Sequence, residues 1–190
     1  MNNFFLQNSC SINLNFLIYI HNLYENYHKS HKTSKFPWLP LKETALLDYN
    51  EMNMKARNLW TAIFDSYDMN DRVDLEWWIN NKFHYYDLFK IDHAGMKLYE
   101  DIKKSFESWY WGIGKHMCDI FSHDLVENYY KELVVMTEKK DLQLKNTTFY
   151  LQVVYNAPPV SWKNKNEKMI IISPETKRPT VDELYDALFN

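Results

Sequence analysis

The chain contains only three glycines among its 190 residues, and this scarcity is the strongest constraint on what it can fold into. They are Gly95, Gly112 and Gly114. Loops that hold a phosphate need several glycines, because the backbone must approach the ligand closely and adopt positive φ angles. Neither G-x-G-x-x-G nor the P-loop pattern can be written in this sequence. Dinucleotide-binding and P-loop folds are therefore not expected, and no cofactor is predicted.

Composition places the chain among ordinary folded proteins. Hydrophobic residues make up 46% of the chain and charged residues 25%, which is typical of a globular protein of one domain. The formal net charge of −3 provides no basic field of the kind that draws proteins to nucleic acids or anionic membranes. Another protein is the expected partner, and no membrane association is expected.

The cysteines and the N-terminal residues indicate the cellular compartment in which the protein is expected. Cys10 and Cys118 are the two cysteines, whereas a disulfide framework needs more. The apolar stretch from Ile12 to Ile20 contains two asparagines and is too short for a membrane span. It also lacks the preceding basic residues of a secretion signal. We expect a cytoplasmic protein, and the abundance of Asn, Lys, Ile and Tyr suggests a low-GC bacterium or a phage as its source.

Apolar residues at helical spacing predict helices along the first two thirds of the chain. Residues 11–20 fit both an alternating strand and a helix, and a helix over about 13–30 is favoured because the helical series runs longer. Residues 132–137 stay open between helix and strand. The clearest stripe alternates steps of four and three, as one broad helix face does. Its members are Ala45, Tyr49, Met52, Ala56, Leu59 and Ile63.

Two aspartates mark expected helix starts. Asp71 is predicted to cap a helix that continues to Phe89. Apolar residues occupy nearly the whole circumference of this helix, so the helix is expected near the centre of the fold. Asp92 is predicted to cap the next helix. Gly112 and Gly114 are expected to bend or break that helix, or to let another element pack closely.

The C-terminal third changes character and determines the predicted fold class. Alternating residues over 149–155 and an apolar run over 169–172 predict two antiparallel strands joined by a long loop. Thr180 and Glu183 form a capping box that opens a short last helix. The expected fold is α+β, a single domain over 1–190. Its helical part covers about 12–138, and a small antiparallel β-hairpin and a terminal helix cover about 145–190.

Trp162 stands apart from the helical stripes that account for most aromatic residues. It lies in the loop between the predicted strands, beside Lys163 and Lys165. An exposed tryptophan there is a candidate binding anchor, since Trp, Tyr and Arg dominate the energetics of protein interfaces. The alternative is that the loop folds back over the sheet and buries the indole. With the neighbouring lysines, Trp162 also provides an alternative of nucleic-acid binding by base stacking.

Three tyrosines are further candidates for partner binding. Tyr85, Tyr110 and Tyr130 each lie next to another aromatic residue on a predicted helix. One member of such a pair can face the core while the other is exposed. Exposed tyrosines with polar neighbours suit a protein-binding surface.

Two groups of residues suggest chemistry. His21, His28 and His31 are spaced by seven and three, so on a helix they share roughly one face and are candidate metal ligands. Solvated histidines at a helix end are the simpler explanation. Cys118 has histidines nearby, as an activated thiolate nucleophile needs, but its apolar neighbours favour a buried, inert cysteine.

The sequence therefore favours a non-enzymatic protein-binding factor, such as an inhibitor, an immunity or antitoxin-like protein, a phage anti-defence protein or an adaptor subunit. One alternative is a metal-dependent hydrolase or nuclease that uses the histidine group. The other is a nucleic-acid-binding protein that uses the lysine-rich loop.

Overall fold

The computed structural model describes residues 3–28, 34–66, 71–139, 145–166 and 168–189. Contacts cluster these residues into two compact units. The helical unit comprises Ile12–Ile113 and Val160–Lys163, and the sheet unit comprises Met1–Ser11, Gly114–Pro159 and Asn164–Asn190. The expectation of a single domain over 1–190 stays a prediction, because two clusters of contacts can belong to one cooperative domain.

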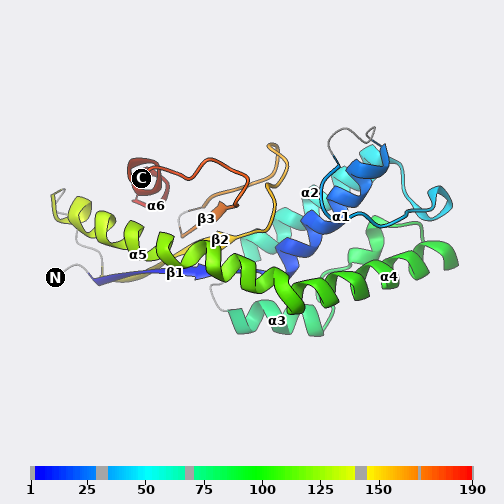
Figure 1. Cartoon of the computed structure of the whole chain (residues 1–190), viewed down its shortest axis with the longest axis horizontal. Helices are drawn as coiled ribbons and strands as arrows, with labels where there is room; N and C mark the ends of the chain where they lie inside the picture. The colour runs from blue at the N-terminus through cyan, green and yellow to red at the C-terminus, as the bar shows by residue number, and fades with distance from the viewer. Residues whose placement is uncertain (1–2, 29–33, 67–70, 140–144, 167, 190) are drawn as a thin grey trace. The chain divides into compact units, whose positions relative to one another are not determined.

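The helical unit is built around one buried helix, α1 (Figure 1). Every residue of α1 from Ile12 to Tyr24 is buried, which confirms the preference for a helix over a strand at residues 13–20. Near its start, the ring of Phe16 lies 5.0 Å from that of Trp78 and 4.9 Å from that of Phe106. The elements of the unit are α1 (Ile12–His28), η2 (Glu43–Ala45), α2 (Tyr49–Ser66), α3 (Asp71–Ile79), η3 (Tyr85–Leu88) and α4 (His93–Trp109).

A buried polar cluster holds the first turn of α1. The carboxylate of Asp74 accepts hydrogen bonds of 2.8 Å from the backbone N–H of Ile12 and from Nδ2 of Asn13. The hydroxyl of Tyr85 donates to Oδ1 of Asn13 at 2.7 Å. The first N–H groups of a helix lack intrahelical partners and favour a nearby negative charge. A residue of α3 thus caps α1.

Helix α3 is much shorter than the sequence predicts, and the expectation of one helix from Asp71 to Phe89 is wrong. It ends at Ile79, where Asn81 adopts a positive φ of 50°. The N–H of Lys82 then donates to the carbonyl of Trp77 at 2.9 Å. This pattern is a Schellman motif, for which asparagine is second only to glycine. The residues after this helix end form η3 and the segment that leads to α4.

The expected cap of α4 and the expected interruption after it are confirmed. Asp92 accepts a hydrogen bond from the N–H of Gly95 at 2.8 Å. A π-helical turn, η4 (Tyr110–Gly114), follows α4 and contains the other two glycines. Helix α5 (Lys115–Lys139) includes residues 132–137, so the open choice there resolves to a helix. The i→i+5 hydrogen-bond spacing of a π-helical turn makes η4 a local break in the α-helical pattern.

The sheet unit contains a three-stranded parallel sheet with the strand order β1-β2-β3. Its strands are β1 (Asn3–Ser9), β2 (Lys145–Val153) and β3 (Met169–Ile172). The predicted antiparallel hairpin is therefore wrong, although both of its strands exist. Parallel neighbours require a crossover connection, which here falls in the sequence between Val153 and Met169. Within the described part of the sheet unit, the one antiparallel contact is an isolated bridge between Lys165 and Ile170.

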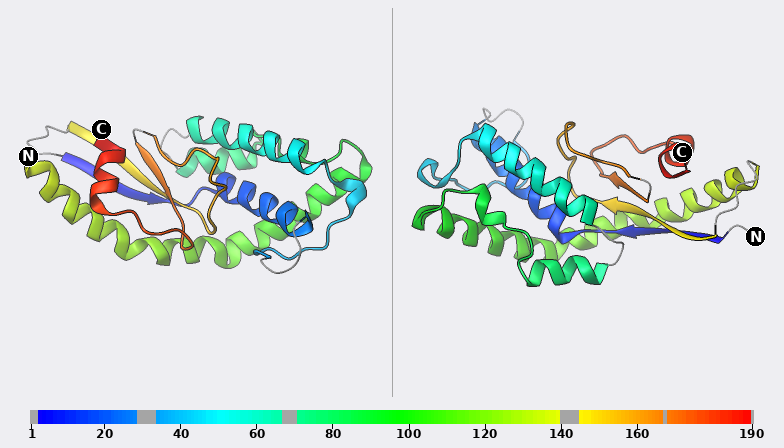
Figure 2. Two further views of the ribbon diagram at one scale, coloured as in Figure 1. Left: turned by 90° about the horizontal axis from the view of Figure 1, so that it is seen from above. Right: turned by 180° about the vertical axis from the view of Figure 1, so that it is seen from behind.

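One face of this sheet carries the core of the unit. Leu6 of β1 pairs with Phe149 of β2, and Leu151 pairs with Ile170 of β3. Helix α5 packs against β1 and β2, while α6 (Val181–Phe189) packs against β3 and α5 (Figure 2). The predicted capping box of α6 is confirmed, since the N–H of Thr180 donates to Oε2 of Glu183 at 2.7 Å. In return, the N–H of Glu183 donates to Oγ1 of Thr180 at 3.2 Å.

Candidate functional site

Trp162 is buried, with only 3% of its surface exposed. Within the helical unit its ring lies 4.9 Å from that of Trp60 and 5.3 Å from that of His21. Trp60 in turn donates its Nε1–H to the carbonyl of Lys163 at 2.7 Å. The indole is buried, as the second alternative expected, but its ring contacts are Trp60 and His21 of the helical unit and not the expected sheet. It anchors the segment Val160–Lys163 and presents no exposed ring to a partner.

The lysines beside Trp162 are exposed, but they differ in their surroundings. The ammonium of Lys163 lies 2.6 Å from Oδ1 of Asp65 and 5.5 Å from the ring centroid of Phe64. This ion pair offsets its charge locally. Lys165, in the sheet unit, is exposed beside its bridge to Ile170.

Two of the three candidate tyrosines are buried. Tyr85 is 3% exposed and Tyr110 is 2% exposed, so neither offers a surface ring. Burial, and next the charge of Asp74, raise the pKa of Tyr85 well above its usual value, which keeps the hydroxyl protonated as a donor to Asn13. Tyr130, in the sheet unit, is 39% exposed and is available for contact.

The histidine group has no common environment in the described residues. His21 is buried against Trp162, whereas His28 is exposed and lies 5.3 Å from the ring of Tyr49. His31 lies outside the described residues. Within the described ranges, no three or more His, Cys, Asp or Glu side chains gather in a way that could hold a metal ion. Cys118 is 2% exposed, which confirms a buried cysteine.

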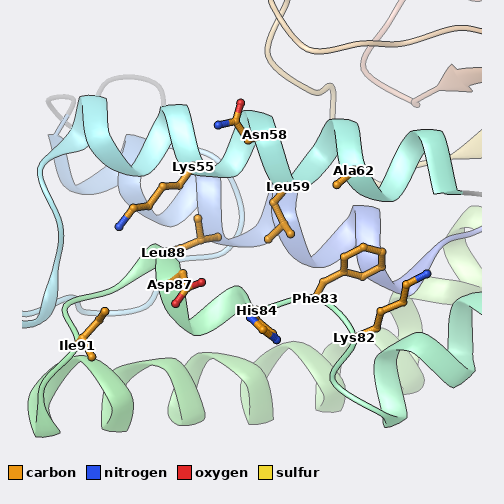
Figure 3. A pocket seen from close by; sticks show the side chains of 10 residues that line it. All are labelled: Lys55, Asn58, Leu59, Ala62, Lys82, Phe83, His84, Asp87, Leu88 and Ile91. Atoms are coloured by element: carbon orange, nitrogen blue, oxygen red, sulfur yellow. The ribbon is translucent and has the colours of Figure 1, made fainter.

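A groove that sequence reasoning missed lies in the helical unit (Figure 3). Its volume is about 610 Å³. Helix α2 forms one wall, and the segment from Lys82 to Ile91 forms the other. The residues that line it are Lys55, Asn58, Leu59, Ala62, Lys82, Phe83, His84, Asp87, Leu88 and Ile91.

The floor of the groove is apolar and firmly held. Phe83 is 8% exposed and Leu88 only 1%. The carbonyl of Leu88 accepts a hydrogen bond of 2.6 Å from the hydroxyl of Tyr24 on α1. At the end of this wall, the N–H of Lys90 donates to the carbonyl of Ala45 at 3.2 Å. Backbone anchors of this kind preorganise the floor before any ligand binds.

The rim combines an exposed apolar side chain with two ammonium groups. Ile91 is 80% exposed. The ammonium of Lys82 lies 3.8 Å from the ring centroid of Trp77, and that of Lys55, on the opposite wall, lies 2.8 Å from Glu51. Asp87 is the one carboxylate in the lining. The arrangement therefore offers apolar surface flanked by Lys82, by Lys55 in its ion pair with Glu51, and by the carboxylate of Asp87.

The groove escaped sequence reasoning because its second wall was assigned to a continuous helix. In a helix through Phe89, Phe83 and Leu88 would lie on different turns of one cylinder and would not line a wall. The signal that could have found it is Asn80-Asn81, because asparagine readily adopts the left-handed conformation that ends a helix.

Comparison with known proteins adds no functional assignment: no family model, curated protein or solved structure matches this chain. None of the helices in the described ranges combines the length and the apolar character of a membrane span. Function is therefore argued from the groove itself.

Proposed function

We propose that this chain is a non-enzymatic protein-binding factor, and that the groove of the helical unit receives a segment of another protein. The observation that carries the proposal is the rim, where Ile91 is 80% exposed beside a floor of buried Phe83 and Leu88. An exposed isoleucine that continues an apolar groove is a common mark of a protein-binding surface.

The chemistry of the groove supports a partner segment that is both apolar and acidic. Apolar side chains of the partner would cover Leu59, Phe83 and Ile91. A carboxylate at its edge would meet Lys82, whereas Lys55 is already paired with Glu51. Amphipathic segments bind such grooves through apolar anchors, and flanking charges add specificity and speed of association more than affinity.

The expected contribution of the rim follows from buried area. Complete burial of an isoleucine side chain is worth about 1.5–3 kcal/mol. Loss of this contribution from Ile91 corresponds to roughly a 10- to 100-fold weaker complex. A charge in its place also has to be desolvated on binding, which increases the loss.

Affinity capture from the native host, followed by mass spectrometry, tests the proposal with three versions of the chain. The wild type is compared with Ile91→Lys and with Val160→Lys. Val160 is a matched control because it is fully exposed, at 104%, and lies in the same unit outside the groove lining. Calorimetric titration of the purified partner then supplies the dissociation constants.

We expect Ile91→Lys to weaken the complex at least tenfold, while Val160→Lys binds as the wild type does. The charge reversal Lys82→Glu should also weaken binding, and less so at high salt because exposed charges are screened. A partner that binds all of these versions equally would contradict the proposal.

We further propose that the protein acts in the cytoplasm, as an inhibitor, an immunity or antitoxin-like protein, a phage anti-defence protein or an adaptor subunit. The low cysteine count supports a reducing compartment, and the net charge of −3 favours a protein over a nucleic acid as the partner.

A further inference from the structure

Among the described residues, strand β1 forms an edge of the sheet, and its own sequence lacks the charges and prolines that often protect such edges. It is seven residues long, Asn3–Ser9, and its sequence NFFLQNS contains no charged residue and no proline. Natural sheets protect their edge strands with charges, prolines, bulges or short length. The one irregularity in its register lies at its first step, between Asn3 and Phe4. From Phe4 onward the edge is regular and uncharged.

A pocket lies beside this edge, within the sheet unit. Its volume is about 430 Å³, and its β1 residues are Phe5, Leu6 and Asn8. Helix α5 supplies the rest of the lining at positions 123, 126, 127 and 130, a spacing that marks one face of a helix. In Figure 2, α5 runs along β1. The helix thus provides a floor next to the edge.

Aromatic side chains at the β1 edge are partly exposed on both faces of the sheet. On the α5 side, Tyr130 is 39% exposed, and its ring lies 5.2 Å from that of Phe4. Leu6 faces the core on that side, so Phe5 points to the opposite face because side chains alternate along a strand. Phe5 is 55% exposed. A strand added at this edge would shield Tyr130 on one face and Phe5 on the other.

We propose that β1 pairs with β1 of a second copy of this chain, in antiparallel register about a two-fold axis at Phe5. The three-stranded sheet becomes a continuous six-stranded sheet in the dimer. A two-fold axis perpendicular to a sheet makes the two central strands antiparallel. This register brings the two Phe5 rings together on one face and places Phe4 opposite Leu6 of the other copy on the face that α5 covers.

A second copy of β1 fits this edge because the strand carries no charge. Antiparallel self-pairing places each residue of β1 opposite another residue of the same strand. A charged strand would therefore often oppose like charges, which destabilises a sheet. The sequence NFFLQNS has no charge to oppose. The pairing also buries an exposed aromatic ring on each copy, and cross-strand aromatic pairs are among the favourable ones.

The oligomeric state of the purified full chain tests the proposal by light scattering after size-exclusion chromatography. We expect a mass of twice 23.1 kDa for the wild type and the monomer mass for Phe5→Lys. Val135→Lys is the matched control, because Val135 is 48% exposed on α5 and points about half a turn away from Val126. It should remain dimeric. Circular dichroism establishes that each variant is folded.

Cross-linking tests the register independently of folding defects in the lysine variant. In a Cys10→Ser background, Phe5→Cys should form a disulfide-linked dimer, because residues paired across antiparallel strands lie within the Cα separation of a disulfide. Gln7→Cys, which faces the same side two residues away, should not. A monomeric wild type, a dimer that survives Phe5→Lys, or cross-linking through Gln7→Cys alone would overturn the proposal. None of these results bears on the groove of the helical unit.

Discussion

Replacement of Asp74 by alanine should destabilise the helical unit strongly. Asp74 is 4% exposed, and its carboxylate accepts hydrogen bonds of 2.8 Å from the N–H of Ile12 and the side-chain amide of Asn13. Hydrogen bonds to charged groups contribute about 1.5–3 kcal/mol each. The substitution also removes the carboxylate acceptor of the Ile12 N–H and leaves the Asn13 amide only its bond to the backbone carbonyl of residue 74, and it removes a negative charge from a helix N-terminus. We expect a loss of about 4 kcal/mol in the free energy of unfolding.

Thermal and urea unfolding, followed by circular dichroism, measure this loss. For a chain of this length, about 4 kcal/mol corresponds to a fall of roughly 10 °C in the melting temperature. Asp74→Asn keeps the shape but turns one acceptor into a donor, so its loss should be about half as large. Asp65→Ala is the control, because Asp65 forms an exposed ion pair with Lys163 and such pairs contribute about 1 kcal/mol or less. A loss for Asp74→Ala no larger than that for Asp65→Ala would refute the reasoning.

Four further predictions concern packing and pH. Gly95→Ala should lower the melting temperature, with a loss of about 2–3 kcal/mol, because an added Cβ would lie 1.9 Å from the carbonyl oxygen of Lys90; a stable variant would contradict this contact. Trp162→Ala should cost about 3–5 kcal/mol in urea unfolding, as expected for removal of a buried tryptophan, and a neutral effect would mean that the indole is not packed. Hydrogen bonds from Thr180 lower the pKa of Glu183 below its usual 4.5, so its stabilisation exists above that value and is lost as the pH falls through the folded-state pKa. Glu183→Gln should therefore be less stable than the wild type near neutral pH and equal to it in strong acid; a pH-independent difference would argue against the capping box. Burial raises the pKa of Tyr85 above 10.0, so the folded state keeps a proton that the unfolded state loses, and stability should fall as the pH rises past about 10. Tyr85→Phe should reduce this alkaline slope in urea midpoints, and an unchanged slope would contradict the assignment.

Local signals in the sequence predicted the helix boundaries that depend on nearby residues. Asp92 caps α4 through Gly95, three residues away, and Thr180 and Glu183 cap α6 across the same separation. Such bonds form between neighbours in the chain, so the pattern of residue types is sufficient to find them. The buried helix at residues 13–20 was also predictable, because its apolar series was longer than the alternating one.

Long-range pairing could not be predicted in the same way. Strands β2 and β3 are recognisable as apolar runs, but their relative direction depends on the path of residues 154–168, which local patterns do not record. Strand β1 pairs with β2 across most of the chain, with Leu6 opposite Phe149, and no local turn marks that pairing. The partners of Trp162, namely Trp60 and His21, are equally distant in sequence.

One wall of the groove could be predicted from local sequence patterns, and the other could not. One of its walls, α2, contains the clearest helical stripe in the sequence, and Leu59 is a member of that stripe. The other wall exists because α3 ends at Ile79, and this end depends on the positive φ of Asn81. Residue types allowed such an end but did not require it, since the apolar residues up to Phe89 also fit a longer helix.

Hydrogen–deuterium exchange with and without the captured partner tests the central claim most directly, because exchange locates a binding surface along the chain. The account predicts slower exchange on binding in residues 55–62 of α2 and in residues 82–91, the two walls of the groove. Unchanged exchange in both walls, with protection confined to other segments, would contradict it.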